Sequence, residues 1–155
     1  SWASATGLGI VDVQQYHGLG KMKILVGIDV QSISEVEDSL QTYGSRYTGR
    51  LFTDDELLSS MGSASNLASQ LASCFAAKEA VLKVLDVADV VPSWKDIEVR
   101  CTTTRQPEIA LSGDAGAIAR RQGVQQMSLS LSHAGDTAGA TVIAEIPLYE
   151  PGAAK

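Results

Sequence analysis

The sequence predicts an α+β domain in which a mainly antiparallel sheet packs against one long central helix. A β-branched apolar run at 23–30 predicts a first strand, and helical periodicity extends over about 67–85. Strand-like runs with one more helix follow, an order typical of α+β folds. With 155 residues, 45% of them hydrophobic and 19% charged, the chain is expected to fold as one compact domain.

The first half of the domain is expected to be one strand followed by helices. Ile33–Tyr43 carries apolar residues at helical spacing with acids between them, which predicts an amphipathic, acidic helix. Thr53 and Glu56 form a capping-box pattern, because each side chain can bind the backbone N–H of the other residue, so a short helix should begin at Asp54. A loop rich in Ser, Gly and Ala then leads to the long helix.

The second half is expected to consist mostly of strands. Pro92 closes the helical region. The elements predicted after it are strands at 96–101 and Pro107–Leu111, a helix at Gly113–Gln122, and strands at 126–131 and 139–146. The last two strands should form a hairpin that turns around Ala134 and Gly135.

Residues 22–147 are expected to form the domain, with 1–21 as a leader or linker outside the fold and 148–155 as a C-terminal tail. Residues 1–21 lack the basic start and the sustained apolar run of a signal peptide. The uncharged stretch at 57–77 is long enough to span a bilayer, but its many Ser, Asn and Gln residues argue against a membrane helix. We therefore expect no membrane association.

Net charge and cysteine content limit the kinds of binding partner and the cellular compartment that we expect. The net charge is −6, from 12 Lys and Arg against 18 Asp and Glu, which is the wrong sign for binding nucleic-acid phosphates. Cys74 and Cys101 are too few for a disulfide scaffold and do not form a Cys-x-x-Cys ligand pair. We expect a cytoplasmic protein that binds no nucleic acid.

Two charged residues interrupt the apolar stripe of the long helix. The stripe consists of Leu71, Phe75, Leu82 and Leu85. At about 100° per residue, Lys78 falls in the middle of it and Glu79 at its edge. A charge there needs a ligand, a water-filled pocket or a protein partner, so the alternative to a functional site is a buried ion pair or a snorkelling Lys stem. Lys83 lies one turn after Glu79. The alternative to a functional role for Lys83 is an ordinary ion pair with Glu79 on the helix surface.

Asp29 and His133 are the remaining candidate site residues. Asp29 ends the first apolar strand, where an acid can equally cap a turn. His133 lies at the tip of the predicted hairpin, where a lone histidine is more often a surface residue than a catalytic one. Taken singly, neither signal is specific.

Taken together, five short motifs carry a family resemblance. They are Gly27-Ile-Asp-Val30, Phe52-Thr-x-x-Glu56, Phe75-Ala-Ala-Lys-Glu-Ala80, Trp94-Lys-Asp-Ile-Glu-Val99, and Leu131-Ser-His133 followed by a small-residue strand. In order and spacing the chain resembles the holo-acyl-carrier-protein synthases, the small type of 4'-phosphopantetheinyl transferase, over about residues 22–145. Their fold is α+β, and they form homotrimers with active sites at subunit boundaries.

The resemblance implies a Mg²⁺-dependent enzyme, with Mn²⁺ able to substitute. Its substrates would be coenzyme A and a serine of an acyl carrier protein or of a carrier domain in a fatty-acid or polyketide synthase. The enzyme would transfer the 4'-phosphopantetheine arm and release adenosine 3',5'-bisphosphate. The serine proton could pass to a metal-bound water or to a nearby carboxylate.

The same resemblance assigns roles to residues. Asp29 and Glu79 would be the metal ligands, and Lys83 and His133 would join them as catalytic residues near the pyrophosphate. The residues expected to contact coenzyme A are Lys78, Lys83, Ser132 and His133.

Three positions depart from the family pattern. Cys74 stands where a basic residue is common, Asp86-Val-Ala-Asp89 replaces a Gly-Thr-Gly-like turn, and Glu35 stands where an arginine often docks the carrier. Two alternatives remain, the first based on Cys74 and the lost turn and the second on the tripeptide at 38–40. The chain could be a catalytically inactive trimeric interaction module, or a carrier domain modified at Ser39 within Asp38-Ser-Leu40, although carrier domains are helical bundles and this sequence predicts strands.

Overall fold

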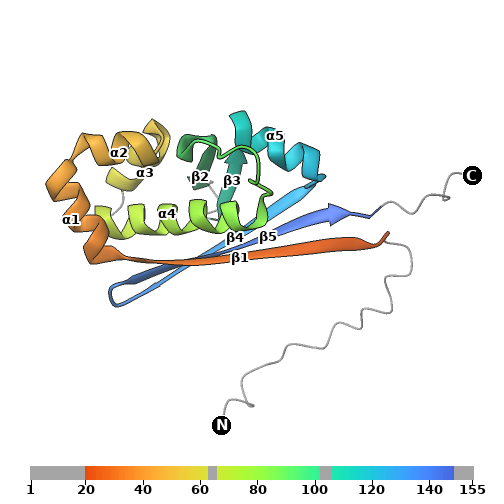
Figure 1. The fold of residues 1–155 in the computed structure, drawn as a ribbon. Helices are drawn as coiled ribbons and strands as arrows, with labels where there is room; N and C mark the ends of the chain where they lie inside the picture. The colour runs from red at the N-terminus through yellow and green to blue at the C-terminus, as the bar shows by residue number, and fades with distance from the viewer. Residues whose placement is uncertain (1–19, 63–65, 102–105, 149–155) are drawn as a thin grey trace, which may run out of the picture.

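The computed structural model describes residues 20–62, 66–101 and 106–148 and has an α+β fold, as predicted. A sheet of long strands forms one layer, the helix α4 lies along it, and the remaining elements cover α4 from the other side (Figure 1). Of the predicted leader 1–21 only Gly20 and Lys21 are described, and of the predicted tail 148–155 only Leu148. The rest of both segments lies outside the described residues.

The elements follow in the predicted order. They are β1 (Met22–Ser32), α1 (Ile33–Tyr43), α2 (Ser45–Leu51), α3 (Asp54–Met61), α4 (Leu67–Val84), the 3₁₀ turn η2 (Trp94–Asp96), β2 (Ile97–Cys101), β3 (Pro107–Leu111), α5 (Gly113–Gln122), β4 (Gln126–Ala134) and β5 (Thr137–Pro147). The sequence did not predict α2, because this short segment has no helical repeat of apolar residues. Asp96 belongs to η2, not to the following strand.

The strands form two antiparallel units. The larger sheet has the order β1-β5-β4, and β2 pairs with β3 in a separate hairpin. β1 and β5 pair over their whole length, from Met22 opposite Pro147 to Ser32 opposite Thr137. Alternate residues of β5 are buried against α4, while no helix or strand of the described residues packs on the other face of the sheet.

Helix α4 lies very close to β1 because small residues line the contact. Ala76, Ala77 and Ala80 are fully buried. A Cβ atom placed on Gly27 would lie 2.1 Å from the backbone oxygen of Ala80, which is an impossible contact. The strand and the helix therefore touch backbone to backbone, and only glycine fits at this point.

No helix in the described part of the chain is long and apolar enough to cross a membrane.

Candidate active site

Strand β1 and helix α4 bring predicted site residues together. Asp29 lies on the α4 side of β1, because it shares the alternation of Leu25 and Gly27. Lys83 Nζ donates to Asp29 Oδ1 at 3.2 Å and to the backbone oxygen of Ile28 at 2.6 Å. The Lys83 side chain is 51% exposed and that of Asp29 14%, so the pair lies at an open edge of the packed layers.

Glu79 joins this pair from the preceding turn of α4. Its side chain is half-buried. Burial raises the pKa of Glu79, the charge of Asp29 raises it further, and the charge of Lys83 lowers it. Two carboxylates from different elements and one ammonium thus share one small space, and we call Asp29, Glu79 and Lys83 the acidic cluster.

Gln31 also contacts the acidic cluster and was not predicted. Its Nε2 donates to Asp29 Oδ2 at 2.7 Å. With Lys83 on Oδ1, both oxygens of the Asp29 carboxylate are held in place. The signal available in the sequence was the spacing of two residues, which places both side chains on one face of a strand.

The donor set of the acidic cluster fits a magnesium ion bound together with a phosphate. Mg²⁺ is commonly held by one or two carboxylates, with waters and phosphate oxygens completing the shell. In the described residues, no group of three or more His, Cys, Asp or Glu side chains could hold a metal ion alone. The pKa of Glu79 is raised first by burial and then by the charge of Asp29, and a cation between the two acids would favour the ionised form against both effects.

Lys78 points away from the acidic cluster and has no exposed surface. Its Nζ donates to the backbone oxygens of Trp94 at 2.9 Å and Ile97 at 2.5 Å, and lies 2.9 Å from Glu56 Oε2. The protein thus occupies all three N–H groups of the ammonium. Burial lowers the pKa of Lys78, and the charge of Glu56 opposes this effect. The expectation that Lys78 contacts coenzyme A is therefore corrected to a buried ion pair, the alternative considered above.

Glu56 has a second role that the capping-box pattern did not reveal. The box itself is present: Thr53 N donates to Glu56 Oε2 at 2.9 Å, and Glu56 N donates to Thr53 Oγ1 at 3.2 Å. The other oxygen, Oε1, accepts from Val99 N at 2.8 Å. Glu56 therefore ties α3, α4 and β2 together through one buried carboxylate.

His133 lies apart from the acidic cluster, whereas Ser132 lines a surface hollow together with Asp29. The strands extend farther than predicted, so His133 is a strand residue paired with Ala138 and is not at the hairpin tip. Strand β5 separates it from Asp29, and among the described contacts no hydrogen bond or ion pair joins the two. Ser132 lines a hollow of about 160 Å³ on the opposite face of the sheet. These two side chains of one subunit therefore cannot both contact a ligand lying on a single face.

The β4–β5 turn is fastened to the start of α1. Gly135 and Asp136 alone connect the strands, and Gly135 has a φ of 56°, which favours glycine. The Asp136 carboxylate accepts from Ser34 Oγ at 2.7 Å, Ser34 N at 2.8 Å and Ser32 Oγ at 2.8 Å. Bonds from the Ser34 and Ser32 side chains lower the pKa of Asp136. The sequence gives no local signal for this contact, because it joins residues about a hundred positions apart.

Comparison with known proteins places the chain in one superfamily. The 4'-phosphopantetheinyl transferase superfamily matches residues 25–142, a range that includes Asp29, Glu79, Lys83 and His133. The chain belongs to the 4'-phosphopantetheinyl transferase superfamily.

Within that superfamily, the chain is an enzyme of the holo-acyl-carrier-protein synthase type, as the motifs predicted. A holo-[acyl-carrier-protein] synthase from Chlamydia trachomatis serovar D is 40% identical over 121 residues, covering 77% of this chain and 98% of the relative. The crystal structure of the Neisseria meningitidis synthase has a TM-score of 0.67 at 30% identity and covers 77% of this chain and 95% of that one. The Helicobacter pylori synthase, solved in complex with coenzyme A, has a TM-score of 0.66 at 27% identity, with coverage of 77% and 99%.

The alternative of a carrier domain modified at Ser39 is wrong. The fold contains two sheets and is not a helical bundle. Ser39 lies in α1, where its hydroxyl donates to the backbone oxygen of Glu35 at 2.9 Å.

Proposed function

We propose that this enzyme transfers 4'-phosphopantetheine from coenzyme A to a serine of an apo acyl carrier protein or carrier domain, in a Mg²⁺-dependent reaction. The observation that carries the proposal is the convergence of Asp29 from β1 with Glu79 and Lys83 from α4. The coenzyme A complex of the Helicobacter pylori relative supports the choice of donor. The transferase domain comprises residues 22–147 and acts in the cytoplasm.

In the proposed reaction the serine oxygen bonds to the phosphorus of the phosphopantetheine. The bond from that phosphorus to the bridging oxygen breaks, adenosine 3',5'-bisphosphate leaves, and the serine proton passes to a base. Such transfers depend mainly on positioning and on neutralising phosphate charge. A bound Mg²⁺, or Mn²⁺ in its place, would supply that neutralisation at the phosphate oxygens.

Three side chains have proposed roles in this step. Asp29 and Glu79 would hold the cation through hard oxygen atoms. Lys83 would stabilise negative charge on the bridging or leaving phosphate, since half of its side chain is exposed beside the cluster. His133 would bind phosphate or assist proton transfer. Since His133 lies apart from Asp29 within one subunit, a site shared between subunits would fit this role.

We further propose that the enzyme is a homotrimer and that β1 contributes to its interface. The open face of β1 carries an alternating apolar row, Ile24, Val26, Ile28 and Val30, which are 50%, 63%, 63% and 62% exposed. A contiguous apolar row of this kind usually marks an interaction surface. Light scattering should give three times the chain mass of 16.3 kDa, and Val26→Lys should reduce it. A monomeric wild-type enzyme would contradict the assembly.

The central experiment is incubation with coenzyme A, Mg²⁺ and a panel of apo-carrier proteins, followed by intact-mass measurement. One added phosphopantetheine on a carrier, lost with EDTA and restored by Mg²⁺ or Mn²⁺, is the expected result. An Asp29→Asn/Glu79→Gln variant that stays folded serves as the inactive control. A folded wild-type enzyme that modifies no carrier would favour the inactive interaction module.

A further inference from the structure

Gln31 contacts the acidic cluster, yet neither the five motifs nor the proposed reaction uses it. The residue is half-buried near the end of β1 and lies two positions after Asp29, on the same face of the strand. Its Nε2 donates to Asp29 Oδ2 at 2.7 Å. An ionised carboxylate only accepts hydrogen bonds, so Gln31 presents its NH₂ group, and not its carbonyl oxygen, to Asp29. This contact therefore sets the direction of the Gln31 amide.

The two oxygens of the Asp29 carboxylate are not held equally. Lys83 Nζ donates to the backbone oxygen of Ile28 at 2.6 Å. It reaches Asp29 Oδ1 only at 3.2 Å, longer than the about 2.7–2.9 Å that is usual between an ammonium and a carboxylate. The contact of Gln31 with Oδ2 is shorter, at 2.7 Å. A neutral donor thus holds Oδ2 firmly, and Lys83 can keep its bond to Ile28 when Oδ1 turns to another partner.

The backbone that carries Gln31 is fixed on both sides. Gln31 pairs with Ala138 of β5, which is fully buried. The next residue, Ser32, caps α1 and donates through Oγ to the Asp136 carboxylate at 2.8 Å. β1 is therefore anchored up to the first turn of α1, and the Gln31 amide reaches Asp29 from a rigid position.

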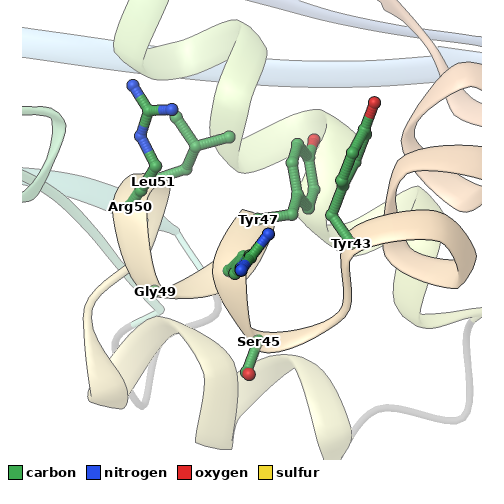
Figure 2. A pocket seen from close by; sticks show the side chains of 7 residues that line it. Tyr43, Ser45, Tyr47, Gly49, Arg50 and Leu51 are labelled. Atoms are coloured by element: carbon green, nitrogen blue, oxygen red, sulfur yellow. The ribbon is translucent and has the colours of Figure 1, made fainter.

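The groups that hold Asp29 come from β1 and α4 and not from the hollow along α2. That hollow, of about 710 Å³, is lined by side chains from the end of α1 and from α2, among them Tyr43, Tyr47 and Arg50 (Figure 2). Among the described contacts, no hydrogen bond or ion pair joins it to Asp29 or Gln31. A change at Gln31 therefore removes no contact of that hollow.

We propose that Gln31 is a positioning residue that holds Oδ2 of Asp29 and thereby presents Oδ1 to the cation. This inference rests on the proposed transferase function. A group that hydrogen-bonds to a metal ligand from outside the coordination shell fixes the orientation of that ligand, and its removal typically costs about 10–100-fold in metal affinity or activity. Gln31 suits this role because it is neutral. It orients the carboxylate without competing with the cation, as a second ammonium would.

The test compares Gln31→Met, which keeps the side-chain length but cannot donate, with Gln125→Met, which changes an exposed glutamine just before β4. Electron paramagnetic resonance measures Mn²⁺ binding with coenzyme A present and no carrier, so that no transfer occurs. We expect the dissociation constant for Mn²⁺ to rise about tenfold in Gln31→Met and to stay unchanged in Gln125→Met. With a carrier added, the half-saturating Mg²⁺ concentration should rise by a similar factor, while kcat at saturating Mg²⁺ stays within about twofold of wild type.

A purely structural role for Gln31 would give another pattern, with a lower melting temperature and wild-type affinity for Mn²⁺. That result, or an equal loss of affinity in Gln125→Met, would overturn the positioning role and leave the transferase function intact. Gln31→Leu, which also lacks a donor, replaces Gln31→Met if the latter does not fold. Wild-type enzyme that binds Mn²⁺ but modifies no carrier would instead overturn the proposed function, and the Mn²⁺ affinities would still decide the role of Gln31. Wild-type enzyme that binds no Mn²⁺ would overturn both.

Discussion

Lys78 and Glu79 are neighbours on one helix, yet they face environments of opposite kind. Lys78 lies fully buried with three protein acceptors, in a network that is complete without a ligand. Glu79 is half-buried, its pKa is raised by burial and by the charge of Asp29, and the charge of Lys83 opposes this effect. The rotation of about 100° between successive helical residues separates the buried charge of Lys78 from the carboxylate that we propose as a metal ligand.

The buried ion pair of Lys78 also determines the direction in which Glu79 points. Because Lys78 is held by Glu56 and by backbone oxygens near β2, the rotation of α4 about its axis is fixed. Glu79 is then directed toward the β1 side without a hydrogen bond of its own among the described contacts. The buried pair thus orients the helix face that carries the site.

The largest effect should come from removing the buried charge. Lys78→Met leaves Glu56 uncompensated in the core and should cost about 3–5 kcal/mol of unfolding free energy, whereas Lys83→Met on the same helix should cost about 1 kcal/mol or less. Urea denaturation measures both. Glu56→Gln/Lys78→Met should recover only part of the loss. No charge is then left unpaired, but an amide cannot accept from both Thr53 N and Val99 N, as the two carboxylate oxygens do. Equal stability of the two lysine variants would contradict the comparison.

Substitution of Asp29 or Glu79 should have the opposite effect to substitution of Lys78: activity should be lost while the fold is retained. Asp29→Asn and Glu79→Gln should each lower transfer by about a hundredfold or more, because Mg²⁺ loses a hard ligand. The melting temperature should hold or rise slightly, since like-charge repulsion is relieved. Glu108→Gln, an exposed acid on β3, is the matched control. Full activity of Glu79→Gln at low Mg²⁺ would remove the metal assignment.

Lys83→Ala should produce an intermediate effect. If the ammonium stabilises charge that develops on the leaving phosphate, kcat should fall about tenfold while KM for coenzyme A changes little. Lys83→Arg should recover part of the rate, since it keeps the charge. Steady-state kinetics with a modified carrier measures this split. Unchanged kinetics would return Lys83 to the role of a surface ion pair.

The smallest effect concerns pH. Glu79 must be ionised to bind Mg²⁺, and its pKa is raised by burial and by Asp29, so the half-saturating Mg²⁺ concentration should increase several-fold as the pH falls from about 8 to about 5. In metal-free protein the sign for folding is opposite: protonation of Glu79 stabilises the fold as the pH falls. NMR titration of Asp29→Asn should show a lowered pKa for Glu79. An unchanged value would mean that the acids do not interact.

Most of the fold could be predicted from the periodicity of apolar residues and from residues typical of helix ends. Ile33–Tyr43 and Gly113–Gln122 have the predicted bounds, and the Thr53 capping box is present. α2 could not be predicted, because its seven residues form a helix only against Phe52 and its core neighbours. The strands of the β4–β5 hairpin were predicted too short because serines, glycines and threonines carry weak strand signals.

The candidate site could be predicted only in part. The motif order identified Asp29, Glu79 and Lys83, which the fold brings together. The burial of Lys78 depended on a carboxylate 22 positions earlier in the chain, so helical spacing could not separate it from a ligand-binding residue. The Asp136 contact likewise depends on tertiary structure.

The contact between Gly27 and Ala80 fixes how closely β1 approaches α4, and with it the separation of the two carboxylates proposed to bind the cation. Asp29 and Glu79 each lie beside this contact, on opposite sides of the gap between strand and helix. A methyl group on Gly27 would force the layers apart and lengthen the span between the two carboxylates. Glycine at position 27 would therefore keep the two carboxylates close enough to share one small cation.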